Sequence, residues 1–295
     1  ESHSLDVFVK PRISIRQQQA DEKSALQEHW QLLPAGVQTL IKRWFLPENR
    51  WLVITEDAGG GKTVLTWYLA AALARLSPAF FIVRYESHFP EDLRTDLQQR
   101  IASAPSVDSL LQTDHCTPQQ ILDDLLLQRR VVVIYDALDQ DNSLAAAQRI
   151  LYLRRDSADQ KLRTGLRLIV TSRPYAVNQN HTAVFALDDW LHCRLELFDD
   201  DQQKAYERQV AKAARAAGFS GRGVVSEQYR QLIPNREAVA ELLAYPIVQS
   251  LLRKLVLDNL AAVDHPTDRK IRQIRNTGDL YWQVGHRSEE RRVGK

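Results

Sequence analysis

Short apolar runs separated by helix-like segments fill the chain up to about residue 198. Three of the runs, at residues 51–54, 80–83 and 131–135, are apolar at consecutive positions. Such continuous apolarity is typical of strands that helices cover on both faces. Strands that alternate with helices favour a parallel sheet. We therefore predict an α/β fold with three α/β/α layers.

Weaker patterns predict the remaining elements of this region. The segment 37–45 is an amphipathic helix with one apolar face, and Thr117 is expected to cap a helix that begins at Pro118. Further strands are predicted at residues 5–11, 166–171 and 193–197, and further helices at residues 21–33, 64–76, 91–102 and 143–154.

The pattern changes near Asp199. Residues 199–217 and 237–260 read as helices without any strand pattern, with Gly218 as a C-cap, residues 218–223 as a mobile connector and Pro246 at a helix boundary. We predict an N-terminal region at residues 1–50, a nucleotide-binding domain at 51–198 and a truncated helical domain at 199–286. The chain has no methionine, and residues 287–295 resemble a translated sequencing adaptor, so we expect a fragment with a non-native tail.

Charge and cysteine content exclude several classes of protein. Lys and Arg number 39 against 37 Asp and Glu, and this balance gives no direct signal for nucleic acid. No apolar run reaches the ~18 residues of a membrane segment. The two cysteines, at positions 116 and 193, exclude a disulfide scaffold and fit a cytoplasmic location.

A glycine-rich turn follows the apolar run at residues 51–54. In such a strand–loop–helix setting, glycines let backbone N–H groups close on a phosphate, a lysine reaches the β- and γ-phosphates, and a threonine holds Mg²⁺. Glu56 stands where the pattern G-x-x-x-x-G-K-[ST] has its first glycine. The predicted cofactor-binding residues of this P-loop are Ala58, Gly59, Gly60, Gly61, Lys62 and Thr63.

Two later strand ends supply further candidates. Asp136 follows four apolar residues and should hold Mg²⁺ together with Thr63, although a helix N-cap is the alternative. Asp139 could orient or activate the attacking water. Arg173 could face the γ-phosphate if its strand lies between the P-loop strand and the strand of Asp136.

These motifs together resemble the nucleotide motifs of NACHT domains in the STAND class of signalling NTPases. The resemblance rests on residues 54–63, 132–139, 169–174 and 242–248. It implies binding of ATP (GTP possible) with Mg²⁺ and places Pro246 near the nucleotide base. It also implies self-association on activation, effector and sensor domains outside this fragment, and a role in innate immunity or antiphage defence.

Other functions remain open on the sequence alone. Gln140 stands where many relatives carry another acid, so a nucleotide-dependent scaffold that binds without hydrolysing is one alternative. A DNA-remodelling or motor ATPase with the same P-loop core is the other. A small-molecule kinase is disfavoured, because the chain shows no lid or acceptor-binding pattern.

Overall fold

The chain forms two compact units, which are described separately. In the computed structural model the sheet unit comprises Arg12–Ala58 and Lys62–Leu195, and the helical unit comprises Glu1–Pro11, Gly59–Gly61 and Glu196–Lys295. The residues that the structure describes are 9–16, 30–77, 79–86, 88–104, 116–141, 144–155, 159–174, 176–177, 185, 190–216, 218–219, 222–261, 273–275 and 279.

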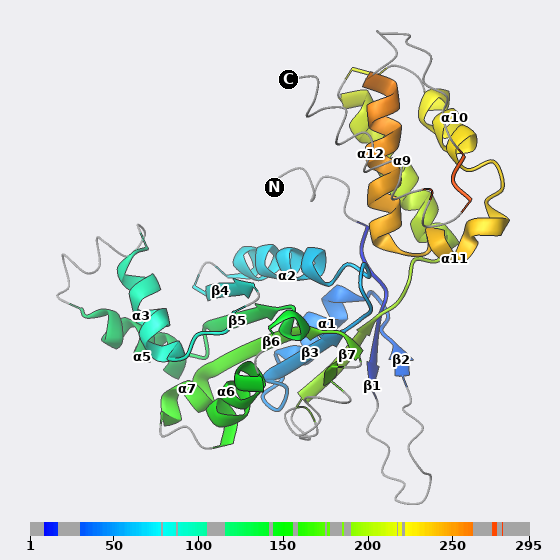
Figure 1. Ribbon diagram of the computed structural model, residues 1–295. Helices are drawn as coiled ribbons and strands as arrows, with labels where there is room; N and C mark the ends of the chain where they lie inside the picture. Colours follow the sequence, from blue (N-terminus) through cyan, green and yellow to red (C-terminus); the bar gives the residue numbers. More distant parts are fainter. Residues whose placement is uncertain are drawn as a thin grey trace, which may run out of the picture. The chain divides into compact units, whose positions relative to one another are not determined.

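The sheet unit is built on a 7-stranded sheet in the order β2-β1-β7-β3-β6-β5-β4 (Figure 1). Strands β7, β3, β6, β5 and β4 are parallel, whereas β1 pairs antiparallel with both β2 and β7. The sheet is therefore mostly parallel, with an antiparallel edge that the sequence did not predict. The strands are β1 (Ile13–Arg16), β2 (Trp30–Leu32), β3 (Trp51–Thr55), β4 (Phe81–Glu86), β5 (Val131–Asp136), β6 (Leu166–Ser172) and β7 (Trp190–Leu195).

Two apolar cores lie on the two faces of this sheet, because side chains alternate along each strand. Trp51 and Val53 point into one core with α3 (Leu93–Ala102), α5 (Pro118–Leu127), α6 (Leu144–Arg155) and α7 (Gln160–Gly165). Leu52 and Ile54 point into the other with α1 (Val37–Trp44) and α2 (Lys62–Leu76). Figure 1 shows α2 on one side of the sheet and α6 and α7 on the other. The predicted three-layer α/β/α fold is confirmed.

Local signals account for where several helices begin. At α5 the Thr117 hydroxyl accepts from the backbone N–H of Gln120 at 3.2 Å and the Gln120 side chain accepts from the backbone N–H of Thr117, a reciprocal capping box. Asp92 caps α3 by accepting from the N–H of Thr95. The predicted N-cap at Thr117 is confirmed.

The N-terminal region differs from its predicted structure. The strand predicted at residues 5–11 lies partly outside the described residues, and residues 9–12 form no strand; β1 begins only at Ile13. The helix predicted at residues 21–33 falls outside the described residues up to position 29, and its end is wrong because Trp30–Leu32 forms β2. Backbone pairing of β2 with β1 outweighs the weak helical pattern there.

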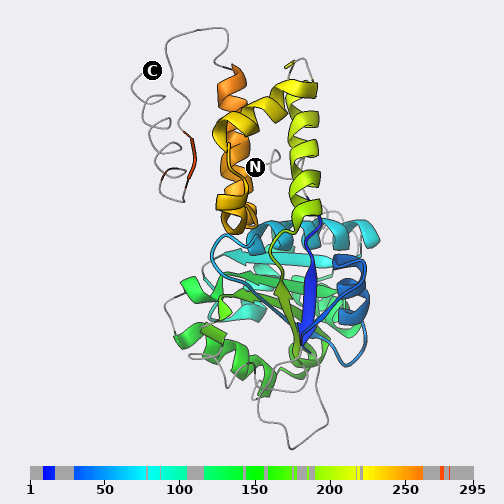
Figure 2. The ribbon, with the colours of Figure 1, turned by 90° about the vertical axis from the view of Figure 1, so that its right-hand side faces the viewer.

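The helical unit packs its own apolar core. Its helices are α9 (Asp200–Ala216), α10 (Arg222–Leu232), the 3₁₀ turn η4 (Glu237–Val239), α11 (Ala240–Leu243) and α12 (Pro246–Ala261). Figure 2 and Figure 1 both show α9 and α12 side by side, and buried residues of α9, α10 and α12 share one cluster. Most of this core comes from the apolar stripes of amphipathic helices, and Phe198, Ile233 and Ile274 complete it from outside the helices.

The connections of this unit match the sequence in part. Gly218 has φ +91° and Phe219 donates its N–H to Ala214, so the predicted C-cap is confirmed. The connector predicted at residues 218–223 is too long, because α10 already begins at Arg222. Pro246 opens α12 as predicted.

The tail at residues 287–295 lies outside the described residues. Among the described helices, none combines the length and apolarity that crossing a membrane requires.

Candidate functional site

The predicted P-loop follows β3 directly and leads into α2, as its motif requires. Gly59 and Gly61 have φ values of +84° and +92°, a conformation that side-chain-bearing residues rarely adopt. The Lys62 ammonium donates to the carbonyl oxygens of Glu56 and Asp57, the latter at 3.0 Å. The lysine therefore folds back over the start of its own loop, where phosphate oxygens would compete with these carbonyls.

Glu56, which replaces the first glycine of the motif, is part of the loop structure. Glu56 is 8% exposed. Its Oε1 accepts from the N–H of Asp57 at 2.9 Å, and its own backbone N–H donates to the carbonyl of Ser172. The side chain thus turns back onto the backbone beside it. This local bond accounts for how a carboxylate is accommodated at a glycine position.

The electrostatic surroundings of Lys62 combine opposing effects. Burial lowers the pKa of its ammonium below the ordinary value, and the nearby cation Arg173 lowers it further. The carboxylates of Asp139, Glu56 and Asp136 raise the same pKa. Lys62 therefore lies within electrostatic range of the aspartates and the arginine that the sequence predicted for this site.

Asp136 is the last residue of β5, and its side chain is 4% exposed. Its Oδ1 accepts from the hydroxyl of Thr171 at 2.6 Å, and its Oδ2 accepts from Nη2 of Arg84 at 2.6 Å. The Thr171 hydroxyl in turn accepts from the N–H of Ala137 at 2.8 Å. Ala137 has φ +64°, so the chain turns sharply at this point. The carboxylate is held from two neighbouring strands and is fixed in direction.

Asp139 and Arg173 lie together in the structure. Nε of Arg173 is 3.0 Å from Oδ2 of Asp139, and the side chain of Asp139 is 3% exposed against 38% for Arg173. Strand β6, which carries Arg173 at its end, lies between β3 and β5. This is the strand order on which the prediction for Arg173 depended. Whether either residue acts in catalysis stays a prediction.

Arg84 is the site residue that sequence reasoning missed. It lies on β4, and alternation places it with Ile82 and Glu86 on the face of the sheet that α2 covers. The signal was present in the sequence, since the charged Arg84 directly follows the apolar run at residues 80–83. A charge in a strand covered on two faces needs a partner, and Asp136 is that partner.

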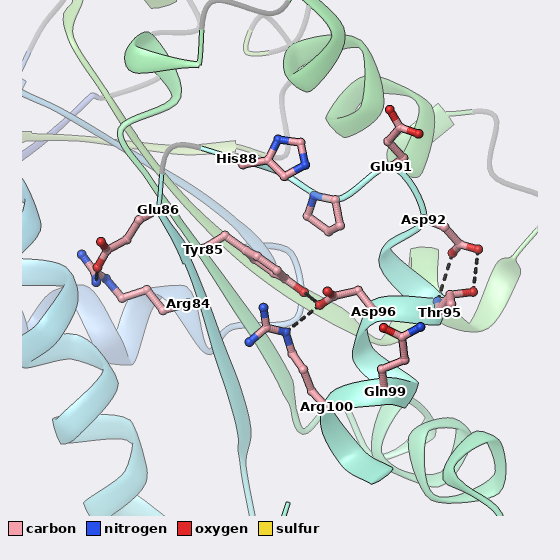
Figure 3. Close-up of a pocket in the computed structure, with 11 residues that line it drawn as sticks. Arg84, Tyr85, Glu86, His88, Glu91, Asp92, Thr95, Asp96, Gln99 and Arg100 are labelled. Carbon is pink, nitrogen blue, oxygen red and sulfur yellow. Dashed lines mark hydrogen bonds and ion pairs between the residues drawn. The ribbon is translucent and has the colours of Figure 1, made fainter. Parts of the chain in front are cut away.

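A pocket of about 490 Å³ opens at the carboxyl end of β4, at the edge of the sheet. Figure 3 shows Arg84 and Glu86 directed to one side of β4, while Tyr85 points to Asp96 and Arg100 on α3. Neither Lys62 nor any residue of the loop lines this pocket. The pocket therefore adjoins the Asp136 cluster through Arg84 and Glu86 but does not contain the predicted phosphate site.

The donor set suits Mg²⁺ and phosphate. The Asp136 carboxylate and the Thr63 hydroxyl are oxygen donors, which Mg²⁺ prefers. Thr63 is exposed on the first turn of α2, and its carbonyl accepts from the Thr66 hydroxyl at 2.8 Å. Positive φ values in the loop and a helix N-terminus at Lys62 suit phosphate oxygens. No group of three or more metal-ligating side chains occurs among the described residues.

Pro246 belongs to the helical unit, as do Gly59, Gly60 and Gly61. Within that unit the N–H of Ile247 donates to the carbonyl of Gly59 at 3.1 Å. A Cβ on Gly59 would lie 2.5 Å from Cγ2 of Ile247, so a larger residue would force Ile247 to shift and would be strained at the φ of +84°. The role of Pro246 beside a nucleotide base stays a prediction.

The profile of the NACHT domain matches residues 50–214, more than half of the chain. The chain belongs to the NACHT domain family. The match spans the loop, Asp136, Asp139 and Arg173, so this NACHT domain is a nucleotide-binding domain of the P-loop NTPase type.

Solved structures with a similar backbone come from distant proteins. Domain III of the replication initiation protein DnaA from Thermotoga maritima is 10% identical, with 84% of this chain and 89% of that chain covered and a TM-score of 0.45. The Walker-type ATPase paby2304 of Pyrococcus abyssi is 11% identical, with coverages of 83% and 68% and a TM-score of 0.43. PCH-2 of C. elegans is 14% identical, with coverages of 75% and 64% and a TM-score of 0.36. No curated protein matches the chain.

Proposed function

We propose that this NACHT domain is an ATP-controlled signalling switch that hydrolyses its nucleotide slowly. ATP binding would favour a self-associated form, and hydrolysis would return the protein to its resting form. Effector and sensor segments outside the present sequence would supply output and input. A cytoplasmic protein of innate immunity or antiphage defence fits this design, as the NACHT resemblance implies.

One observation carries the proposal, namely that the ends of three neighbouring strands bring complementary groups together. Lys62 follows β3, Asp136 ends β5, and Arg173 follows β6, which lies between them. The pKa of Lys62 responds to Asp136, Asp139 and Arg173. A triphosphate needs cations for its oxygens and a carboxylate for its metal ion, and this cluster contains both.

Each side chain has a distinct part in the proposed chemistry. Lys62 and the loop N–H groups bind the phosphates, and Thr63 and Asp136 hold Mg²⁺, which when bound neutralises charge on the phosphate oxygens. Asp139 orients the attacking water, and Arg173 stabilises the negative charge of the γ-phosphate. Both roles require Asp139 and Arg173 to exchange part of their mutual ion pair for contacts with substrate.

A switch of this kind works only through differential affinity. A ligand shifts a 1:99 equilibrium to 99:1 when it binds the favoured form more tightly by about 5.5 kcal/mol. ATP and ADP differ by the γ-phosphate, so the discriminating contacts should come from residues that face it. Lys62 and Arg173 are the two cations proposed for that role.

A second function deserves a test because the Asp139 carboxylate is paired with Arg173 at 3.0 Å. A carboxylate held in this way is a poor acceptor for a proton from water while the pair persists. This observation favours a nucleotide-dependent scaffold that binds ATP without turning it over. In that case binding alone would drive self-association.

The test measures molecular mass and phosphate release in parallel. We expect the mass of the particles to rise with Mg²⁺-ATP and to fall again as phosphate is released, with Mg²⁺-ADP as the control. Persistent assemblies without phosphate release would favour the scaffold. Phosphate release that rises many-fold with duplex DNA, without self-association, would instead favour the motor or DNA-remodelling alternative. A mass that is the same with ATP and ADP would contradict the switch.

A further inference from the structure

The guanidinium of Arg84 is bound on every side by groups of the sheet unit. Nη2 donates to Oδ2 of Asp136 at 2.6 Å, Nε donates to the Thr66 hydroxyl at 3.1 Å, and Nη1 pairs with Glu86. Its Cζ lies 4.3 Å from the ring centre of Trp67. The side chain is 10% exposed. A planar cation with three partners and an aromatic neighbour has a fixed position.

The two carboxylates that share this cation have different surroundings. The side chain of Asp136 is 4% exposed, whereas that of Glu86 is 62% exposed. A buried carboxylate without a compensating cation is strongly unfavourable, whereas an exposed one is solvated by water. The buried Asp136 therefore needs the charge of Arg84 to be stable, whereas the exposed Glu86 is a second carboxylate with which Arg84 pairs.

Arg84 also reaches the helix that follows the P-loop. The Thr66 hydroxyl accepts from Nε of Arg84 and donates to the carbonyl of Thr63. The cation thus lies beside both residues that the sequence assigns to Mg²⁺, directly at Asp136 and through one hydroxyl at Thr63. A divalent cation at the Asp136 carboxylate would be repelled by the guanidinium that this carboxylate already binds.

We propose that Arg84 is an internal counter-ion of Asp136 that opposes divalent cations at this carboxylate until a nucleoside triphosphate adds its own negative charge. The inference rests on the proposed function for the assignment of Asp136 to Mg²⁺. When Mg²⁺ and triphosphate bind together, the four or so added negative charges outweigh the repulsion. The guanidinium then gives up its contact with Asp136 and keeps its existing pair with Glu86. Metal binding and nucleotide binding are coupled by this residue.

The experiment titrates Mn²⁺, a paramagnetic substitute for Mg²⁺, into the nucleotide-free protein and follows free Mn²⁺ by electron paramagnetic resonance. In Arg84→Gln the carboxylates lose their counter-ion, so we expect Mn²⁺ to bind at least about tenfold more tightly than in the wild type. Arg100→Gln is the matched control, because Arg100 pairs with Asp96 at 2.6 Å on the other side of β4. The control should bind Mn²⁺ like the wild type.

A second variant assigns the gained site. Arg84→Gln combined with Asp136→Asn should lose the tighter binding, because the carboxylate that Arg84 neutralised is gone. Tight Mn²⁺ binding that persists in the double variant would overturn the inference, as would wild-type Mn²⁺ affinity in folded Arg84→Gln. If Arg84→Gln does not fold, Arg84→Lys takes its place. Lysine keeps the charge but lacks the planar fork with which the guanidinium spans its three partners, so an intermediate gain is expected and no gain overturns the inference.

A nucleotide-binding measurement on the same variants distinguishes failure of this inference from failure of the proposed function. Binding of a fluorescent ATP analogue is measured at increasing Mg²⁺ for the same variants, and Arg84→Gln should reach half-maximal binding at about tenfold less Mg²⁺. If no variant binds the analogue at any Mg²⁺ concentration, the proposed function fails. The Mn²⁺ titration still tests the competition between Arg84 and a divalent cation in that event.

Discussion

Arg173 binds Asp139 twice: its backbone N–H donates to Oδ1 at 3.2 Å, and its Nε lies 3.0 Å from Oδ2. The aspartate is nearly covered, whereas 38% of the arginine side chain stays exposed. The exposed part of the guanidinium can contact a ligand while the backbone N–H of Arg173 keeps its bond to Asp139, even if part of the ion pair is exchanged. The pair therefore links the residue proposed to orient water with the residue proposed to contact the γ-phosphate.

Replacing Asp139 by asparagine should slow turnover and leave nucleotide binding largely intact. Asparagine keeps an oxygen for the N–H of Arg173 but loses the charge that orients or activates water. We expect the single-turnover hydrolysis rate to fall by about 100-fold, with the dissociation constant for Mg²⁺-ATP changed only slightly by calorimetry.

The matched control is Asp141→Asn. Asp141 accepts from the Tyr135 hydroxyl at 2.7 Å and is a neighbouring acid of the same connection. Its replacement should leave hydrolysis near the wild-type rate. Unchanged hydrolysis in Asp139→Asn would remove Asp139 from the proposed chemistry.

Replacing Lys62 by alanine should abolish measurable binding of Mg²⁺-ATP. The ammonium is the charged donor of the loop, and it lies half-buried where its interaction with phosphate is poorly screened. Calorimetry should show a loss of affinity of about 100-fold or more, since a charge-assisted contact to phosphate is worth several kcal/mol. Lys161→Ala, which removes a lysine paired with Asp123, should bind normally. Tight binding by Lys62→Ala would refute the P-loop assignment.

Nucleotide binding should weaken at a lower pH than the ordinary pKa of a lysine side chain would predict. Burial lowers the pKa of Lys62 below its ordinary value of 10.5, so the bound cation is lost as pH rises through that lowered pKa. The phosphates are already fully ionised in this range, so their charge stays constant. Dissociation constants measured between about pH 7 and pH 10 should rise towards the alkaline end.

Lys62→Arg tests the origin of this pH dependence. A guanidinium stays charged throughout the range, so whatever affinity the variant retains should be independent of alkaline pH. An alkaline decline of equal size in both proteins would assign the titration to another group.

Ala137 should tolerate glycine but not a β-branched residue. Its φ of +64° is left-handed, and this conformation costs a non-glycine residue roughly 1–2 kcal/mol. Ala137 already bears this cost, and a β-branched side chain adds crowding at the same φ, so Ala137→Val should lower the free energy of unfolding by about a further 1 kcal/mol. Ala137→Gly should leave it nearly unchanged, because relief of strain offsets the added freedom of the unfolded chain. Urea denaturation curves compare the three proteins. Equal midpoints for the valine and glycine variants would contradict this account.

The sequence predicted the central strands well because each of those signals is local. A run such as residues 131–135 is apolar at every position, and its burial on both faces follows from that pattern. Strand β2 was missed because three residues of mixed polarity, Trp30–Leu32, become a strand only by pairing with β1. Residues 222–232 gave no clear prediction because the glycine at position 223 masked the start of α10.

The contacts within the site could not be predicted in the same way. Thr171 and Arg84 come to Asp136 from two neighbouring strands, β6 and β4, so their contacts depend on strand order. An arginine directly after an apolar run shows that a partner must exist, but it does not show which one. The pairing of Asp139 with Arg173 likewise depends on β6 lying next to β5.

The position of β3 inside the sheet has a consequence for biosynthesis. Its partners are β6 and β7. Trp51 can therefore form its strand pairs only after Leu168 on one side and Trp190 on the other have been synthesised. At about 5–20 residues per second, the P-loop strand leaves the ribosome on the order of ten seconds before both partners exist. Its apolar residues stay exposed during that interval. A chain cut short before β7 leaves one edge of the P-loop strand unpaired, and such chains should depend on chaperones that shield an unpaired strand.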